Sequence, residues 1–387
     1  MGAERRDAGM CTAVTYRTED HYFGRTLDYT CSYGETVTVT PRRFPFHFRL
    51  AGSMETHFAM IGTAFVTEGQ PLYYDATNEK GLSMAGLNFP GNAFYPAASG
   101  HAVCGNGAGA GEGSKVEIAS FEIIPWILGQ CTTAAQARTL LKRCRIVNLA
   151  FQDSLPPASL HWIIADRDSA ITVESMRDGM HIYENPIGIL TNNPPFDYQM
   201  MHLNQYLSLT PEVPVNRFCS RLDLQPQSQG VGAFGLPGDA SSQSRFVRAA
   251  FTKLNAVSGP SEMDSVSQFF HILEAVSVPR GTVRLREEIQ TDEEQAHAAP
   301  HGTKLHENGR DGDGRKRKDD DVIPQRERLS YDTTIYSSCC NTDKGIYYYR
   351  TYENSQISGV ALHRTELDDF RLRSWPLIRE QQIRMQN

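Results

Sequence analysis

Residues 11–29 contain two apolar-rich runs separated by a short polar segment. The first run covers residues 11–16, the second ends at Tyr29, and the polar segment lies near residues 18–21. This pattern predicts a β-hairpin. Folding the second strand back onto the first brings Arg25 and Asp28 alongside Cys11.

Cys11 is a candidate nucleophile. A thiol becomes reactive when a nearby base deprotonates it, and a cysteine that begins the mature chain carries such a base in its own α-amino group. The solution pKa of that amine, about 7.7–8.0, lies close to the thiol value of about 8.5, so no histidine is required. A neighbouring cation such as Arg25 favours the thiolate. The alternative, from these residues alone, is a buried structural cysteine, which is the commoner role.

The run 11–14, followed by 23–29, resembles the choloylglycine hydrolase family of N-terminal-nucleophile hydrolases, which includes conjugated bile salt hydrolases and penicillin V acylases. Further blocks match the family in the same order, at 78–82, 85–90, 190–194, 235–239, 244–246, 278–281, 345–349 and 351–354. The matching blocks extend over nearly the whole chain, from Cys11 to about Glu353.

The resemblance implies roles for three residues in amide hydrolysis. Cys11 is the nucleophile, and its α-amine acts first as base and then as acid toward the leaving amine. Asn192 matches the family's Asn in Thr-Asn-x-Pro and donates its side-chain N–H to the oxyanion, while Asn88 donates its backbone N–H. Asn88 and Asn192 each lie near a proline, so without the resemblance a role in turns is the better interpretation.

Three charged residues complete the implied site. Asp28 holds the α-amine, and Arg25 and Arg245 set the local positive field. The simpler alternatives are an ordinary ion pair for Arg25 and Asp28, and an exposed residue in the first turn of a helix for Arg245.

The implied function is cleavage of the C–N amide bond of glycine- or taurine-conjugated bile salts by a homotetramer. A penicillin V acylase or an N-acyl-homoserine-lactone acylase is the alternative. Family acylases of the penicillin type tend to carry tyrosine at the position of Asn88, so Asn88 favours bile salts. A more distant alternative is a non-catalytic binding protein on the same fold.

The pattern of elements predicts an α+β fold. Helices are expected at 117–131, 133–144, 196–206, 244–254 and 261–276, and they bracket many alternating strands, including pairs at 160–166 with 170–175 and at 181–183 with 188–191. Two stacked, mainly antiparallel sheets covered by helices on both outer faces satisfy this order. The resemblance implies the same four-layer αββα sandwich. Cys339 and Cys340 are expected on one strand, with one thiol on each face.

A single domain is expected over residues 11–387, preceded by one segment and containing two others that differ from the rest of the chain. Residues 1–10 are interpreted as a propeptide or as an untranslated leader that precedes a start at Met10. Residues 100–114 form a glycine-rich loop. Residues 292–328 are highly charged and hold few large aliphatics, which predicts an inserted disordered loop.

Composition excludes several classes of protein. The net charge of −7 gives no basic domain for nucleic acid. The longest apolar runs fall far short of the roughly 20 residues of a membrane span, and residues 1–7 lack the apolar core of a secretory signal. Apart from the adjacent pair at 339 and 340 the eight cysteines are scattered, which favours a reducing, cytoplasmic setting. The histidines are dispersed, so neither a metal site nor a cofactor is predicted.

Overall fold

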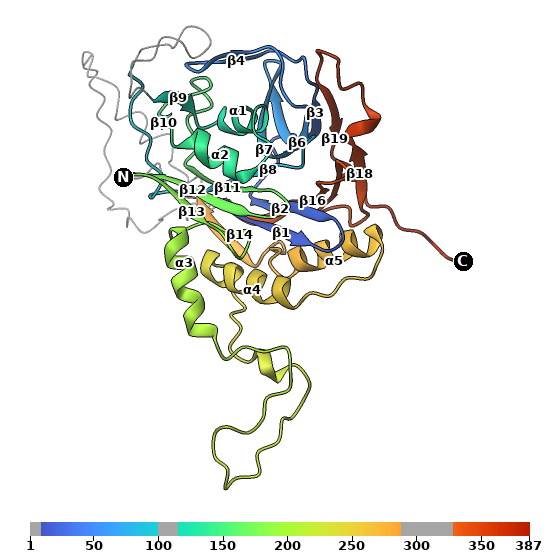
Figure 1. Cartoon of the computed structure of the whole chain (residues 1–387). Coiled ribbons are helices and arrows are strands. Elements are labelled where there is room, and N and C mark those ends of the chain that lie inside the picture. Colours follow the sequence, from blue (N-terminus) through green and yellow to red (C-terminus); the bar gives the residue numbers. More distant parts are fainter. Residues whose placement is uncertain (1–8, 100–114, 288–327) are drawn as a thin grey trace, which may run out of the picture.

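The computed structural model describes residues 9–99, 115–287 and 328–387. The expected glycine-rich loop at 100–114, residues 1–8 of the expected leader and residues 292–327 of the expected insertion lie outside these ranges. Arg328, placed at the end of that insertion, instead begins a strand. The described parts form two stacked sheets with helices on both outer faces, which confirms the predicted αββα sandwich (Figure 1).

The first sheet carries the amino-terminal hairpin at its centre. In the described part of the chain its antiparallel strands run in the order β14 (Ile189–Leu190), β1 (Met10–Arg17), β2 (His21–Tyr29), β16 (Arg328–Asn341), β17 (Ile346–Thr351) and β18 (Ser358–Ala361), and β15 (Val283–Glu287) also pairs with β16. The predicted hairpin is therefore confirmed. It begins one residue inside the expected leader, because Met10 pairs with Asp28.

The second sheet is also antiparallel. Its order is β13 (Gly179–Glu184), β12 (Ala170–Met176), β11 (Leu160–Ala165), β8 (Ser83–Asn88), β7 (Gln70–Asn78), β6 (Met60–Thr67), β3 (Thr36–Thr40) and β19 (Arg373–Pro376). Two small pairs flank it: β4 (Phe46–Phe48) with β5 (Gly52–Met54), and β9 (Val116–Ala119) parallel to β10 (Cys144–Val147). Asn88 is the last residue of β8, an inner strand of this sheet.

Helices form the outer layers. In Figure 1, α1 (Ile123–Leu128) and α2 (Ala134–Leu141) cover the second sheet, and α4 (Ser242–Asn255) and α5 (Glu262–Glu274) cover the first. α3 (Phe196–His202) continues into a short 3₁₀ turn, η2 (Leu203–Tyr206); two more such turns are η3 (Val231–Ala233) and η4 (Leu362–Arg364). Hydroxyl side chains cap three of these helices: Thr133 caps α2, Ser241 caps α4, and Ser261 forms a capping box with Asp264 at the start of α5.

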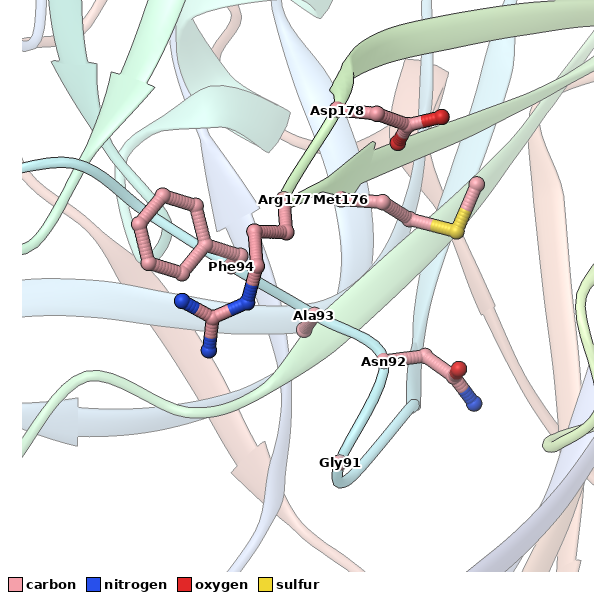
Figure 2. A pocket seen from close by; sticks show the side chains of 7 residues that line it. All are labelled: Gly91, Asn92, Ala93, Phe94, Met176, Arg177 and Asp178. Atoms are coloured by element: carbon pink, nitrogen blue, oxygen red, sulfur yellow. The ribbon is translucent and has the colours of Figure 1, made fainter.

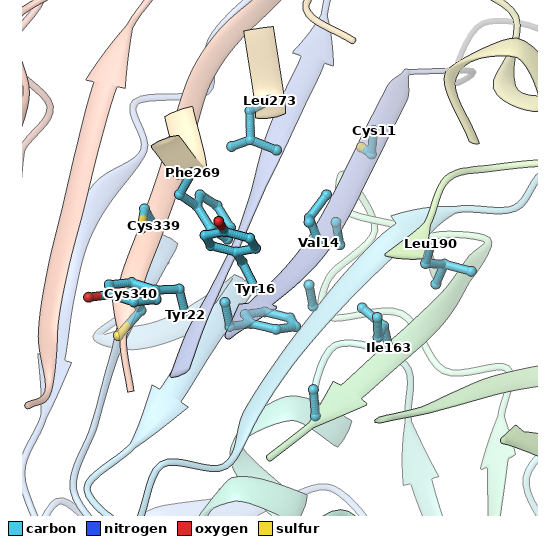
Figure 3. Packing of buried hydrophobic residues seen from close by; sticks show 14 of the residues in the cluster. Cys11, Val14, Tyr16, Tyr22, Ile163, Leu190, Phe269, Leu273, Cys339 and Cys340 are labelled. Atoms are coloured by element: carbon cyan, nitrogen blue, oxygen red, sulfur yellow. The ribbon is translucent and has the colours of Figure 1, made fainter. Parts of the chain in front are cut away.

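A large apolar core fills the space between the sheets and beneath α4 and α5. Figure 3 shows Cys11, Val14 and Leu190 at one side of this cluster and the adjacent cysteines of β16 at the other. Cys340 lies beside Thr77 of the second sheet, whereas Cys339 is close enough to Glu262 of α5 to feel its charge. The two thiols therefore face opposite sides of the first sheet, as expected from strand geometry.

Two expected elements are wrong. Residues 117–131 are not one helix: β9 occupies Val116–Ala119, and α1 begins only at Ile123, with Pro125 in its first turn, where its missing N–H costs nothing. Glu122 accepts the backbone N–H of Ala119 and so separates the two elements. The strands near 181–183 and 188–191 do not pair either, because β13 adds to β12 and β14 adds to β1.

Between η2 and α4 the chain leaves the sandwich and returns, and we call residues 207–236 the arm (Figure 1). Several of its large apolar side chains are exposed: Leu207, Val213, Val215, Phe218, Leu222, Leu224 and Phe234. Phe218 is 86% exposed and Phe234 is 90% exposed.

None of the helices in the described residues has the length and apolar character of a membrane span.

Candidate active site

The register of the hairpin places Cys11 and Arg25 on one face of the first sheet. Cys11 pairs with Leu27, and Arg25, two residues before Leu27, pairs with Ala13. Because side chains alternate along a strand, these residues share the face that points toward the second sheet. Arg25 donates from Nη2 to the Cys11 sulfur at 2.6 Å and from Nη1 to the carbonyl oxygen of Tyr74 at 3.1 Å. The buried guanidinium thus joins the thiol to the facing sheet.

Asp28 lies on the opposite face, toward α4. Its carboxylate accepts the hydroxyls of Thr26 at 3.1 Å and Thr334 at 2.6 Å. Burial raises the pKa of Asp28, and the charge of Arg245 opposes that rise. Arg245, fully buried on α4, donates to the Thr12 hydroxyl at 2.8 Å and to the carbonyl oxygen of Cys11. Arg25 therefore lies on the same face of the sheet as the thiol, whereas Arg245 and Asp28 lie on the face that α4 covers.

Asn192 and Asn88 meet at Cys11. The Cys11 backbone N–H donates to Asn192 Oδ1 at 2.9 Å, and Arg245 donates to the same oxygen at 2.7 Å. This fixes the orientation of the amide, so that Nδ2 faces Asn88 and donates to its carbonyl oxygen at 2.8 Å. The backbone N–H of Asn88 hydrogen-bonds the Cys11 thiol. The structure thus brings all six residues named from the sequence into one cluster around Cys11.

The electrostatics of the thiol depend on the preceding residues. Burial raises the pKa of Cys11, Arg25 and Arg245 lower it, and Asp28 raises it further, with a net shift above the ordinary value. In the full chain the nitrogen of Cys11 is part of a peptide bond, and an amide nitrogen is not a base. This form therefore lacks the α-amine that the resemblance implies as the base.

Gly9, from the expected leader, lies against Asn88 and Tyr29 beside the cluster. Gly9 is buried, and its carbonyl oxygen accepts the side-chain N–H of Asn88 at 3.1 Å. A Cβ atom at Gly9 would collide with the ring of Tyr29 and would lie 3.0 Å from Asn88 Nδ2. The leader backbone thus occupies the space between Tyr29 and Asn88.

Two residues without a sequence signal hold the Asn192 segment. Ser242, the first residue of α4, accepts the backbone N–H of Asn192 at 2.8 Å and donates to the Thr191 hydroxyl at 2.9 Å. Gln199 on α3 donates weakly to the carbonyl oxygen of Asn193 at 3.3 Å. These contacts tie the start of α4 and the first turns of α3 to the segment that follows β14. Nothing in the local pattern marks either residue, since both are ordinary polar residues of a helix.

An open pocket of about 380 Å³ lies beside the loop that follows Asn88 (Figure 2). One lining residue, Asn92, donates to Oδ1 of Asn193 at 2.8 Å, and Asn193 directly follows Asn192 in the chain. The guanidinium of Arg177 lies over the Phe94 ring, 4.8 Å from its centroid. The other lining residues are Gly91, Ala93, Met176 and Asp178, and none of the six clustered residues is among them.

Comparison with known proteins extends over nearly the whole chain. The family model described as linear amide C–N hydrolases, choloylglycine hydrolase family, matches residues 11–294 and 322–373. A bile salt hydrolase/transferase from Lactiplantibacillus plantarum is 44% identical over 96% of this chain and 98% of its own length. A bile salt hydrolase/transferase from Clostridium perfringens is 30% identical over 95% of this chain and 96% of its own length.

Two solved structures share the architecture. A crystal structure of a conjugated bile acid hydrolase variant from Clostridium perfringens has a TM-score of 0.76 at 28% identity, covering 97% of this chain and all of that one. The penicillin V acylase from Agrobacterium tumefaciens has a TM-score of 0.63 at 16% identity, covering 94% of this chain and 90% of that one. The second likeness shows a shared fold alone.

Proposed function

The chain belongs to the choloylglycine hydrolase family of linear amide C–N hydrolases, and from this membership we propose that it hydrolyses the amide bond of glycine- or taurine-conjugated bile salts. The observation that carries the choice of substrate is the 44% identity, over 96% of the chain, to a protein named as a bile salt hydrolase/transferase. The penicillin V alternative has only the likeness of fold at 16% identity in its support.

In the proposed reaction Cys11 attacks the substrate carbonyl carbon. The free α-amine, once residues 1–10 are absent, takes the thiol proton and later gives it to the leaving amine nitrogen. Arg25, 2.6 Å from the sulfur, stabilises the thiolate that forms in this buried site. Asn192 Oδ1, 2.9 Å from the Cys11 nitrogen, orients the amine, and Asp28 balances the charge of Arg245 behind it.

The carbonyl oxygen becomes an oxyanion as the C–S bond forms. The proposed donors to this oxygen are the backbone N–H of Asn88, which contacts the Cys11 thiol, and Nδ2 of Asn192, which contacts the Asn88 carbonyl oxygen. Loss of one such donor typically reduces kcat by about 10²–10³-fold. Collapse of the intermediate breaks the C–N bond, releases glycine or taurine, and leaves the bile acid as a thioester on Cys11.

The thioester then reacts with a second nucleophile. Water attack forms the free bile acid and restores the thiol, which completes hydrolysis. An amine that attacks instead forms a new amide, and the names of the Lactiplantibacillus and Clostridium relatives include a transferase activity. We propose that this protein also transfers the bile acid to an amine, because hydrolysis and transfer proceed from the same thioester and use the same α-amine to accept the proton.

The direct test uses purified protein that begins at Cys11. We expect it to release glycine from glycocholate or taurine from taurocholate, and to cleave penicillin V at least about tenfold more slowly, judged by kcat/KM. Amine release is measured with ninhydrin. Faster turnover of penicillin V than of both bile salts would overturn the proposed substrate class.

We also propose that the protein self-associates, in line with the tetramer implied by the resemblance. The exposed apolar side chains of the arm support this, because several large apolar side chains exposed within one segment are typical of an interaction site. A cytoplasmic setting is proposed as well: the cysteines of the described residues are all unpaired, which suits a reducing compartment.

Charging the arm should reduce the molecular mass of the assembly. The double variant Phe218→Asp, Phe234→Asp places two carboxylates where a second copy would bury two phenyl rings, and buried unpaired charge is strongly unfavourable. Light scattering after size-exclusion chromatography should show a shift toward the monomer. Phe370→Asp is the matched control, since Phe370 is 60% exposed on another surface. An unchanged mass for the double variant would contradict the proposed interface.

A further inference from the structure

A buried histidine lies directly behind the two proposed oxyanion donors. His161 on β11 is fully buried, and its ring stacks on Phe89 with centroids 4.3 Å apart and planes inclined by 7°. Its Nε2 lies 2.8 Å from the carbonyl oxygen of Thr191. Phe89 follows Asn88 in the chain and Thr191 precedes Asn192. One imidazole therefore contacts both segments that supply the donors, although these segments belong to different sheets.

The orientation of this ring is fixed by its partners. A carbonyl oxygen can only accept, so Nε2 carries the proton of the Thr191 hydrogen bond. Nδ1 lies 3.0 Å from Oε1 of Glu174 on β12, which is fully buried as well. The same Glu174 oxygen accepts the backbone N–H of Phe196 at 3.0 Å, at the start of α3. Both ring nitrogens and one ring face are thus engaged, which leaves the imidazole a single position.

We propose that His161 is a positioning residue for amide hydrolysis, setting the separation between the Asn88 N–H and the Asn192 side chain. This proposal rests on the proposed function, which makes those groups the oxyanion donors. His161 has no hydrogen bond to Cys11 among the described residues, so it acts only through the two segments. Displacement of a catalytic group by about 1 Å can cost about 10²-fold in rate, so a shift of either segment should be visible in kcat.

The informative substitution is His161→Phe. Phenylalanine keeps an aromatic face for Phe89 but removes the hydrogen bonds to Thr191 and Glu174. We expect kcat for conjugated bile salts to fall about 10–100-fold, with KM changed less than about threefold. His161→Gln can still donate to the Thr191 carbonyl, and it should recover part of the lost kcat. If His161→Phe does not fold, His161→Gln alone carries the comparison with the parent protein.

Alkylation of Cys11 separates positioning from general damage. Displacement on iodoacetamide occurs at a tetrahedral carbon and forms no oxyanion, so its rate should stay within about threefold of the parent value while hydrolysis falls. His21→Phe is the matched control: His21 is also buried, bonds the Thr342 hydroxyl at 2.9 Å, and lies at the opposite end of β2 from the cluster. Its kcat should be unchanged.

The outcomes distinguish the two proposals. An active parent protein whose His161 variants keep full kcat, or lose alkylation and hydrolysis in parallel, overturns the positioning role alone. A parent protein that is alkylated at Cys11 but hydrolyses neither glycocholate nor taurocholate overturns the proposed function, and this inference with it.

Discussion

The Cys11→Ala protein is expected to lose amide hydrolysis below detection while it keeps its fold. Removal of an enzyme's nucleophile reduces kcat by as much as about 10⁶-fold, because no other group can form the covalent intermediate. The remaining donors, Asn88 and Asn192, bind the carbonyl oxygen without a thiol to attack it. The substitution removes one buried sulfur, and Arg25 retains its bond to Tyr74, so the melting temperature should change little.

Hydrolysis of glycocholate and a thermal melt check this prediction together. Cys339→Ala is the matched control, because Cys339 is equally buried but lies in the core near α5. It should keep full activity, whatever small stability it loses. Measurable turnover by Cys11→Ala, beyond what trace parent protein explains, would remove Cys11 from the role of nucleophile.

The second large effect concerns residues 1–10, which we propose are absent from the active protein. A chain that starts at Met10 exposes the α-amine of Cys11 after ordinary methionine removal. A chain that retains the leader has an amide in place of that amine, and Gly9 fills the space between Tyr29 and Asn88. We expect the retained form to be inert, because it lacks the α-amine base and because Gly9 lies against Asn88, a proposed oxyanion donor. The family match that begins at residue 11 supports this proposal.

Met10→Leu in the full chain decides between the two routes to Cys11. It removes the internal start, so every molecule begins at Met1. If translation normally starts at Met10, intact mass should show residues before Cys11 and activity should be absent. If the leader is instead cut off, the mass should correspond to a start at Cys11 and activity should be retained. Full activity from protein whose mass includes residues 1–10 would falsify the α-amine mechanism itself.

The sequence predicts the site better than it predicts the orientation of its members. The apolar runs of the hairpin, and their spacing, were enough to place Arg25 and Asp28 near Cys11. Only the register of the hairpin shows on which face of the sheet each side chain lies. Arg25 shares the face of Cys11, whereas Asp28 pairs with Met10 and faces α4. A one-residue change of register would exchange these faces, and the turn sets that register.

Prediction from the sequence fails for elements whose secondary structure depends on pairing with a strand far away in the chain. Ile118 fits the helical spacing of Phe121 and Ile124 as well as a strand, and the choice is made by parallel pairing with β10, 28 positions later in the chain. The same holds within the site. Ser242 and His161 carry no local signal, because their contacts with Asn192 and Thr191 exist only once α4 packs on the first sheet and the two sheets stack.

The contacts of Cys11 also determine the stage of protein synthesis at which the site around it can assemble. Its nitrogen bonds a residue 181 positions away, and its carbonyl oxygen bonds one 234 positions away. Contacts of such range carry a high loop-closure cost and form late in folding. A nascent chain therefore presents Cys11 in an accessible terminus until α4 emerges from the ribosome. We expect the proposed removal of residues 1–10 to fall in that interval, and catalytic competence to appear only after α4 has packed against the hairpin.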